Sequence, residues 1–370
     1  MRFFLSHMSC ACALGRSNAE ALAAYDAGEA PGMREISGDI PGRSVFFGAV
    51  PGEMPPVSEP EFDMRACRLL LHAARNFRDE LDAFLARHER VAVVLGASNT
   101  GIDEAQRGID RWLDSGAKPE SMRFSQMELG TPSDFLRRLL GASGPSYTVS
   151  TACSSSTKAF AAARRLVEIG AADAAIVGGV DGRCRFAMNG FNSLGALSSG
   201  RCRPLAPDRD GINLGEGVAL FTLEKAPDGA PPARFPVAVR LAGCGESSDA
   251  YHATAPDPDG GGAEAAMRSA LEDAGIGPDD VAYLNLHGTG TMANDEMEMK
   301  AVRRVFGDAP RAKVESTKSL TGHCLGAAGA VEAAICWMLL ASGRVKGAAL
   351  SNSFAFGGSN ASVVLASEVA

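Results

Sequence analysis

The sequence predicts an α/β protein built on a largely parallel sheet with helices on both faces. Two patterns in its 370 residues support this fold class: short apolar runs alternate with longer helical segments, and the alternation occurs twice along the chain. Strands buried on both faces of a sheet are near-continuously apolar, as these runs are. At about 150 residues per domain, the length fits two domains or one large duplicated fold.

The first half contains strand, helix and strand in that order. Residues 90–96 form a buried strand that ends at a glycine, and residues 146–151 form another. A helix from about 154 to 170 follows, and residues 174–179 form the next strand. A first buried strand is expected near Phe3. This order favours a parallel sheet with crossover helices.

The second half repeats this plan. Residues 281–286 form an apolar strand, and the helix predicted over 263–274 ends before Gly275, a common C-terminal stop. The remaining predicted elements are a helix over 296–306, a strand over 313–316, a helix over about 325–342, and strands near 348–352 and Leu365.

A stretch rich in proline and glycine at 226–232 is the best candidate linker between two similar halves. We therefore expect an N-terminal half over 1–225 and a C-terminal half over 235–370. Residues 28–63, rich in glycine, proline and acidic side chains, are interpreted as surface connections.

Composition excludes several classes of protein. The chain is 46% hydrophobic and 22% charged, so it can bury a sizeable core and is not generally disordered. Its net charge of −8 and the lack of a Lys/Arg cluster argue against nucleic-acid binding. No apolar stretch approaches the ~18 residues of a membrane-spanning helix, and the first residues are better explained by a buried strand than by a signal peptide.

Nine cysteines, an odd number without a CxxC pair, indicate reduced thiols and a cytoplasmic location. Cys10 and Cys12, with His7 nearby, lack a second ligand pair at zinc spacing, so no metal site is predicted. No GxGxxG follows a strand and no P-loop occurs, so a nucleotide cofactor has no support.

Cys153 is the candidate nucleophile. It lies in the segment 151–157 (TACSSST), where a strand runs directly into an alanine-rich helix. The free N–H groups and positive dipole of a helix N-terminus favour a thiolate. A buried structural cysteine beside a capping serine is the alternative.

Two of the six histidines follow apolar strands at glycine-rich turns. They are His287, in LHGTGT, and His323, in STKSLTGH. Ligands of open α/β sheets bind beyond the carboxyl ends of the strands, where both would meet Cys153. One nucleophile with two imidazole N–H donors suits acyl transfer followed by stabilisation of an enolate or oxyanion. Glu332 is a candidate partner of Lys318, although an exposed glutamate on a helix surface explains it as well.

The loop 352–360 (NSFAFGGSN) places two phenylalanines beside small residues and a glycine pair. This composition suits an apolar lid whose backbone N–H points into a site. A β-turn between two C-terminal strands is the simpler interpretation.

Taken in order, these segments resemble the β-ketoacyl-acyl-carrier-protein synthases, the elongating condensing enzymes of the thiolase fold. The similarity runs from the first strand to the last. The motifs that carry it are 151–155 (TACSS), 203–211 (RPLAPDRDG), 215–217 (GEG), 251–260 (YHATAPDPDG), 287–291 (HGTGT), 318–323 (KSLTGH) and 356–358 (FGG).

The resemblance implies five αβαβα layers from two homologous halves, usually in a dimer, and an acyltransferase that acts in fatty-acid or polyketide-type synthesis. Cys153 would take an acyl chain from the phosphopantetheine arm of an acyl carrier protein. The chain would then condense with malonyl-carrier protein by decarboxylative Claisen chemistry. No cofactor of its own is implied, and no metal. The partners implied are the carrier protein and a second ketosynthase-like chain, in a homodimer or a heterodimer.

The resemblance also implies a role for each site residue. His287 and His323 would assist decarboxylation, and Lys318 with Glu332 would hold the histidine environment. The N–H groups of Cys153 and Phe356 would form the oxyanion hole, with Phe356 as gatekeeper. Thr289 and Thr291 would hydrogen-bond the pantetheine amides.

Three departures stand out. Family members commonly have glycine before the gatekeeper, whereas this chain has Ala355, which lacks glycine's freedom at positive φ. Asn294 replaces the glycine of the usual Gly-Asp pair that ends at Asp295. The region 99–145 matches poorly, so acyl-chain length cannot be carried over. A basic docking patch for the carrier is expected, with Arg65, Arg68 or Arg164 as candidates.

Two other functions compete. A chain-length-factor-like subunit would shape a partner ketosynthase without catalysis, but such subunits generally lack the nucleophilic cysteine. A thiolase or chalcone-synthase-like enzyme would act on coenzyme A esters, but those relatives pair cysteine with His plus Cys or Asn. The two histidines and Lys318 favour the ketosynthase.

Overall fold

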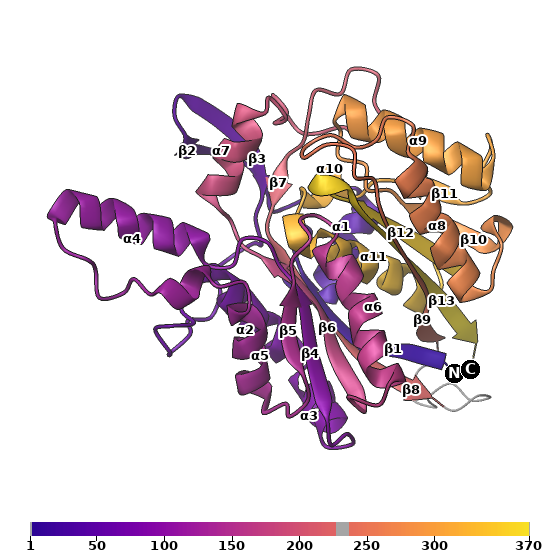
Figure 1. Cartoon of the computed structure of the whole chain (residues 1–370), viewed down its shortest axis with the longest axis horizontal. Coiled ribbons are helices and arrows are strands. Elements are labelled where there is room, and N and C mark those ends of the chain that lie inside the picture. The colour runs from indigo at the N-terminus through magenta and orange to yellow at the C-terminus, as the bar shows by residue number, and fades with distance from the viewer. Residues whose placement is uncertain (1, 227–236, 370) are drawn as a thin grey trace.

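In the part of the chain that the structure describes, ten strands lie in one sheet, to which each half contributes five (Figure 1). The computed structural model of the chain describes residues 2–226 and 237–369. In sheet order the N-terminal strands are β5 (Ser146–Val149), β4 (Val91–Gly96), β6 (Ala174–Asp181), β8 (Gly217–Ala226) and β1 (Arg2–Ala11). The C-terminal strands are β11 (Lys313–Glu315), β10 (Val281–Asn285), β12 (Ala348–Phe354), β13 (Ser359–Val369) and β9 (Val237–Ser248).

The two halves share one topology. In each, the first three strands in the order given are parallel, and the last two pair antiparallel. β1 and β9 meet through one pair, Phe4 with Arg240. The division into 1–225 and 235–370 stays a prediction. Apart from Ala226, which ends β8, the candidate linker lies outside the described residues.

The two halves of the sheet form two separate layers, and helices complete the five layers, as predicted. α6 (Ser155–Glu168) and α11 (Ala328–Ala341) lie at the centre, where each contacts strands of both halves of the sheet. The outer layers are α2 (Arg65–Asn76), α3 (Arg78–Leu85) and α5 (Thr131–Leu140) on the N-terminal half, and α8 (Gly261–Ala274) and α9 (Met292–Phe306) on the other. This arrangement explains the apolar strands, because every residue of β4 and β6 is buried.

The region 28–63 was wrongly expected to hold only surface connections. It contains the hairpin of β2 (Met33–Ile40) and β3 (Arg43–Gly48), and β3 also pairs with β7 (Leu214–Gly215). Polar side chains on the exposed positions of β2 hide the strand pattern, while Phe47 of β3 is buried.

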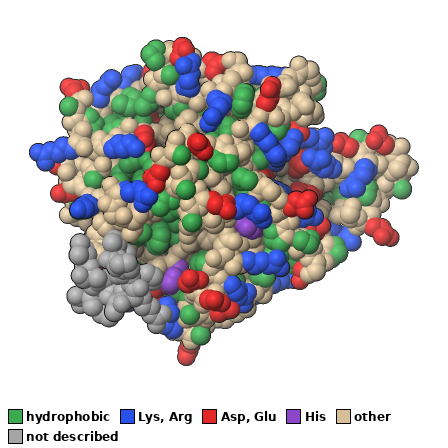
Figure 2. Space-filling view, turned by 180° about the vertical axis from the view of Figure 1, so that it is seen from behind, with side chains coloured by type: hydrophobic (Ala, Val, Ile, Leu, Met, Phe, Trp, Pro, Cys, Tyr) green, Lys and Arg blue, Asp and Glu red, His purple; other side chains and the backbone are tan. Residues whose placement is uncertain are grey.

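One element projects from the body. α4 (Ile102–Ser115) extends as an arm at the left of Figure 1, followed by the short helix η1 (Phe124–Met127). Basic and acidic side chains lie together near the base of the arm, at the right of Figure 2. Within the described ranges, no helix combines the length and apolarity needed to cross a membrane.

The other helices and helical turns of the described residues connect these elements. They are α1 (Asn18–Ala27), α7 (Arg185–Ser193), α10 (Lys318–Thr321) and the short turns η2 (Pro278–Asp280), η3 (Leu325–Ala327) and η4 (Phe356–Gly358). One of them, η3, packs against β6, α6 and α11.

Candidate active site

Cys153 lies on a sharp turn between β5 and α6. The residue before it, Ala152, has a φ of 51°, in the left-handed region that costs a non-glycine residue roughly 1–2 kcal/mol. Two hydrogen bonds stabilise the turn: Thr151 N–H donates to Ser155 Oγ at 2.9 Å, and Ser154 Oγ donates to the Thr151 carbonyl at 2.9 Å. The serines that follow the nucleophile therefore hold the strained turn that presents it.

The first turns of α6 and α11 are in direct contact. Ala330 N–H donates to Ser156 Oγ at 2.9 Å. A Cβ atom at Gly329 would lie 1.9 Å from Thr157 Oγ1, so only glycine permits this approach. The contact brings His323, just upstream of α11, to the side of the nucleophile.

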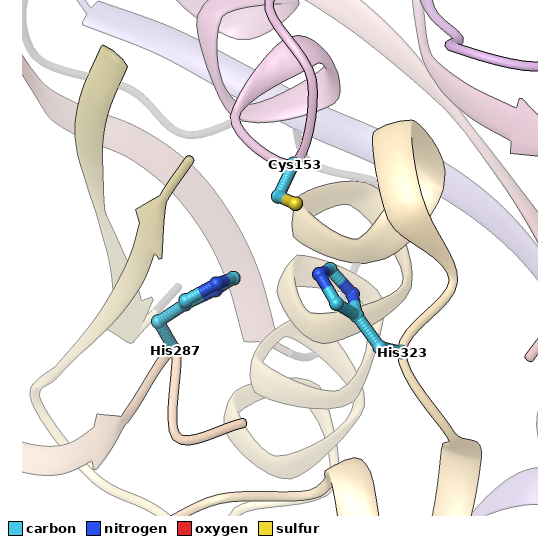
Figure 3. Close-up of side chains that lie close together, drawn as sticks. All are labelled: Cys153, His287 and His323. Atoms are coloured by element: carbon cyan, nitrogen blue, oxygen red, sulfur yellow. The ribbon is translucent and has the colours of Figure 1, made fainter. Parts of the chain in front are cut away.

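Three side chains from the two halves converge at this point (Figure 3). The Cys153 sulfur and one nitrogen each of His287 and His323 all lie within 4.8 Å of one another. The imidazole rings are nearly perpendicular, at 82°, with centroids 5.2 Å apart. The convergence predicted from the sequence is therefore present.

Glu298 of α9 holds the backbone at His287. Its carboxylate accepts hydrogen bonds from His287 N–H at 2.8 Å, from Gly288 N–H at 2.7 Å and from Asn352 Nδ2 at 3.1 Å. Burial raises the pKa of Glu298 to about 7, although these donors oppose the shift.

Lys318 sets the protonation of His287. Its fully buried ammonium donates to the His287 carbonyl at 2.5 Å, lies 3.4 Å from His287 Nδ1 and forms an ion pair with Glu332. Since an ammonium only donates, Nδ1 is the acceptor, and the neutral ring carries its proton on Nε2. Glu332 is buried, so the alternative of an exposed helix residue is wrong.

His323 adopts the same tautomer for a similar reason. Leu325 N–H donates to His323 Nδ1 at 3.3 Å, which leaves the proton on Nε2. That nitrogen is buried and has no hydrogen-bond partner among the described residues. Burial, with the charge of Lys318, holds the pKa of both His287 and His323 well below the usual value. Both rings are therefore neutral and direct an N–H at the site.

These tautomers bear on metal binding. One thiol and two imidazoles at this spacing have the geometry of a metal-ligand set. A metal-bound imidazole would need its proton on Nδ1, but the groups facing both Nδ1 atoms are donors. The surroundings therefore favour two hydrogen-bond donors over two metal ligands.

Burial, rather than the position at the helix N-terminus, has the largest effect on the pKa of the Cys153 thiol. It raises the pKa of Cys153 to about 11, while the charge of Lys318 and the N–H groups of Phe356 and Cys153 itself act in the opposite direction. The expected resting thiolate is therefore not supported. The two N–H groups do point toward the sulfur, where an oxyanion hole is required.

An apolar pocket of about 200 Å³ leads to the sulfur. Phe356 and Phe191 stack across it, with ring centroids 5.5 Å apart, and Phe356 stays 36% exposed. The hydroxyls of Thr289 and Thr291 lie 2.9 Å apart in its wall. Ala355 has a φ of −110°, a conformation open to any residue, so alanine is unstrained there.

The three arginines suggested for a docking patch have acidic partners, and the patch stays a prediction. Arg164 is largely buried in ion pairs with Glu168 and Asp273, so it is unsuited to a docking patch. Arg65 and Arg68 line a charged groove, but they pair with Glu216 and Asp63.

Sequence reasoning missed Phe191, Glu298 and Asp181. Asp181 ends an apolar strand just before a glycine, which is a usable signal for a functional turn. Phe191 and Glu298 lie within ordinary helical patterns and give no such signal.

Two family models match most of the chain. "Beta-ketoacyl synthase, N-terminal domain" matches residues 55–229, and "Beta-ketoacyl synthase, C-terminal domain" matches residues 238–349.

Among curated proteins, 3-oxoacyl-[acyl-carrier-protein] synthase 2 of Staphylococcus aureus is 38% identical over 255 residues, 66% of this chain and 62% of that protein. Nodulation protein E of Rhizobium leguminosarum bv. trifolii is 40% identical over 249 residues, 60% of this chain and 61% of that protein. The matched region thus spans about three fifths of the length of these relatives.

Solved structures agree over nearly the full length. A chain of the ketosynthase ApeO in complex with its chain length factor ApeC, from Xenorhabdus doucetiae, has a TM-score of 0.91 and 40% identity, and the match covers 99% of this chain and 98% of that one. A chain of the ishigamide ketosynthase/chain length factor has a TM-score of 0.85 and 29% identity, with the same coverage. On these matches and on the shared fold, the chain belongs to the beta-ketoacyl synthase family.

Proposed function

We propose that this chain is a β-ketoacyl-acyl-carrier-protein synthase that extends an acyl chain by decarboxylative condensation. One observation carries the proposal: a thiol and two neutral imidazoles with Nε2–H donors meet within 4.8 Å beside an apolar pocket. The 3-oxoacyl-[acyl-carrier-protein] synthase 2 relative supports this choice of activity.

The first step is acyl transfer to Cys153. The sulfur attacks the thioester carbonyl of an acyl-carrier protein, and the N–H groups of Cys153 and Phe356 hold the oxyanion that forms. The carbon–sulfur bond to the pantetheine arm then breaks, and the proton of the Cys153 thiol passes to the departing pantetheine sulfur. The products are the acyl-enzyme and a free carrier thiol.

The second step uses malonyl-carrier protein. The bond to its carboxylate breaks, carbon dioxide leaves, and the electron pair forms an enolate whose oxygen accepts from Nε2–H of His287 and His323. The enolate carbon attacks the Cys153 thioester and forms the new carbon–carbon bond. Collapse of the tetrahedral intermediate releases the β-ketoacyl-carrier protein, and the Cys153 thiolate takes up one proton from solvent.

The other site residues orient these groups. Lys318, fixed by Glu332, keeps the His287 proton on Nε2. Thr289 and Thr291 lie in the wall of the pocket, where their hydroxyls can bond the pantetheine amides. Phe356 covers the approach to the sulfur. The pantetheine arm is supplied by the substrate carrier, so no cofactor of the chain itself is required.

The proposed partners are an acyl carrier protein and a second chain of the same fold. The relative named as an acyl-carrier-protein synthase supports the first, and two similar structures that contain a chain length factor support the second. Because Cys153, His287, His323 and Lys318 are all present in the geometry described, we assign this chain the catalytic role in such a pair.

The test compares Cys153→Ala with Cys67→Ala, a matched change at another buried cysteine. Intact mass after incubation with acyl-carrier proteins should show one acyl adduct on the parent and on Cys67→Ala, and none on Cys153→Ala. Condensation should follow the same pattern. A Cys153→Ala protein that extends acyl chains as fast as the parent would refute the proposal. A parent chain that never forms an acyl-enzyme would favour the non-catalytic subunit instead.

A further inference from the structure

Asp181 is a fully buried carboxylate at the carboxyl end of β6, between the two catalytic halves. Among the described residues it forms no ion pair with a lysine or arginine. Its oxygens instead accept from Ser98 N–H at 3.0 Å, Ser98 Oγ at 2.8 Å, Asn99 N–H at 2.7 Å and Gly326 N–H at 2.7 Å. Four donors converge on this one carboxylate.

The last of these donors belongs to the turn that follows His323. Gly326 lies so close that a Cβ atom there would be 2.7 Å from Asp181 Oδ2. The residue before it, Leu325, has a φ of 51°, and such strain persists only where the surroundings impose it. Asp181 accepts the hydrogen bond from Gly326 N–H and so holds the backbone directly after the strained Leu325.

The strained residue is also the one that faces the imidazole. Leu325 N–H donates to His323 Nδ1 at 3.3 Å, and this bond keeps the His323 proton on Nε2. Contacts therefore run without a break from Asp181 through Gly326 and Leu325 to His323. Buried carboxylates are costly unless fully hydrogen-bonded, and here the hydrogen bonds join a turn of the N-terminal half to the histidine turn of the C-terminal half.

We propose that Asp181 is a positioning residue that holds the Leu325–Gly326 turn and thereby keeps the His323 proton on Nε2. Its effect on catalysis rests on the proposed function, whereas its effect on the tautomer does not. Loss of the carboxylate frees the turn to relax from the left-handed conformation and removes the N–H donor from Nδ1. A ring with its proton on Nδ1 would present a bare nitrogen to the substrate oxygen.

The test uses Asp181→Asn, which keeps the shape but faces an N–H₂ group toward backbone donors. Glu224→Gln is the matched control, because Glu224 is a largely buried carboxylate of β8 that bonds Ser6 and faces Arg87, away from the site. Nitrogen-15 spectra of histidine-labelled protein report the tautomer, with the His323 signals identified from their absence in His323→Gln.

The parent and Glu224→Gln should show His323 protonated at Nε2, and Asp181→Asn should lose that state. Removal of one oxyanion-stabilising donor typically costs about 100-fold or more in rate. We expect condensation by Asp181→Asn to fall by about this factor, while acyl loading on Cys153 changes less than about threefold.

Three results would overturn the proposal. They are a parent His323 protonated at Nδ1, an unchanged tautomer in a folded Asp181→Asn protein, and equal loss of acyl loading and condensation. If Asp181→Asn does not fold, a parent His323 protonated at Nδ1 still overturns the proposal. A parent without condensing activity would refute the proposed function and leave the tautomer measurement standing.

Discussion

The buried Lys318–Glu332 pair predicts that stability and catalysis can be separated. The two side chains are 0% and 2% exposed, and the ammonium uses its donors on Glu332 and His287. Lys318→Met leaves Glu332 as an unpaired buried charge. Breaking a buried pair in this way typically costs about 3–5 kcal/mol, so the free energy of unfolding should fall by that amount.

Replacing both partners should restore most of this loss. In Lys318→Met with Glu332→Leu no charge remains buried without a partner, and such apolar replacements are often close to neutral. Condensation should nevertheless stay low, because no ammonium then faces His287 Nδ1 to keep the proton on Nε2.

Denaturant titration and condensation rates on the parent, both single variants and the double variant test this reasoning. The expected result is a double variant near the parent in free energy of unfolding and near Lys318→Met in rate. Recovery of both quantities would show that Lys318 acts only on folding. A Lys318→Met protein destabilised by less than about 1 kcal/mol would refute the account of the buried charge.

Three further predictions concern Cys153 and two residues of the pocket beside it. Burial raises the pKa of Cys153 to about 11, so its alkylation by iodoacetamide should become ~10-fold faster per pH unit between pH 7 and 10. Intact mass measures the alkylation rate, and a plateau of that rate by pH 8 would contradict a neutral resting thiol. Loss of the aromatic stack, worth about 0.5–1.5 kcal/mol, should make acyl loading roughly 2- to 12-fold faster in Phe191→Ala, but not in Phe186→Ala, an exposed position on the same helix. Ala355→Gly should lower the free energy of unfolding by about 0.4–1 kcal/mol, because alanine is unstrained there, and a gain in stability would show that the loop strains it.

The layered fold was predictable because its central elements are buried on both faces. β4, β6 and α11 are apolar almost throughout, and their order along the chain is a sufficient signal. The β2–β3 hairpin was missed because one of its faces meets solvent, so its strands carry charges between the apolar positions. The start of α9 at Met292 was placed four residues late, since its first turn is mostly polar or small.

The reacting groups were also predictable, because Cys153 follows a strand at a helix N-terminus and His287 and His323 follow strands at glycine-rich turns, which places all three at one edge. The pKa of Cys153 and the contacts that hold the histidine turns could not be predicted. The raised pKa of Cys153 comes from burial in the folded chain, which no local motif records. Glu298 and Asp181 act on the histidine turns through backbone N–H groups, and any side-chain pattern can accompany such contacts.

The missing side chain at Gly329 has a mechanical consequence. The Cys153 sulfur belongs to the N-terminal half and the two imidazole rings to the C-terminal half, so their spacing depends on how closely the two halves pack. At the contact between α6 and α11, any added side-chain volume increases the distance between the two helices. A single methyl group at Gly329 would therefore move Cys153 away from the two imidazoles without altering any group that reacts.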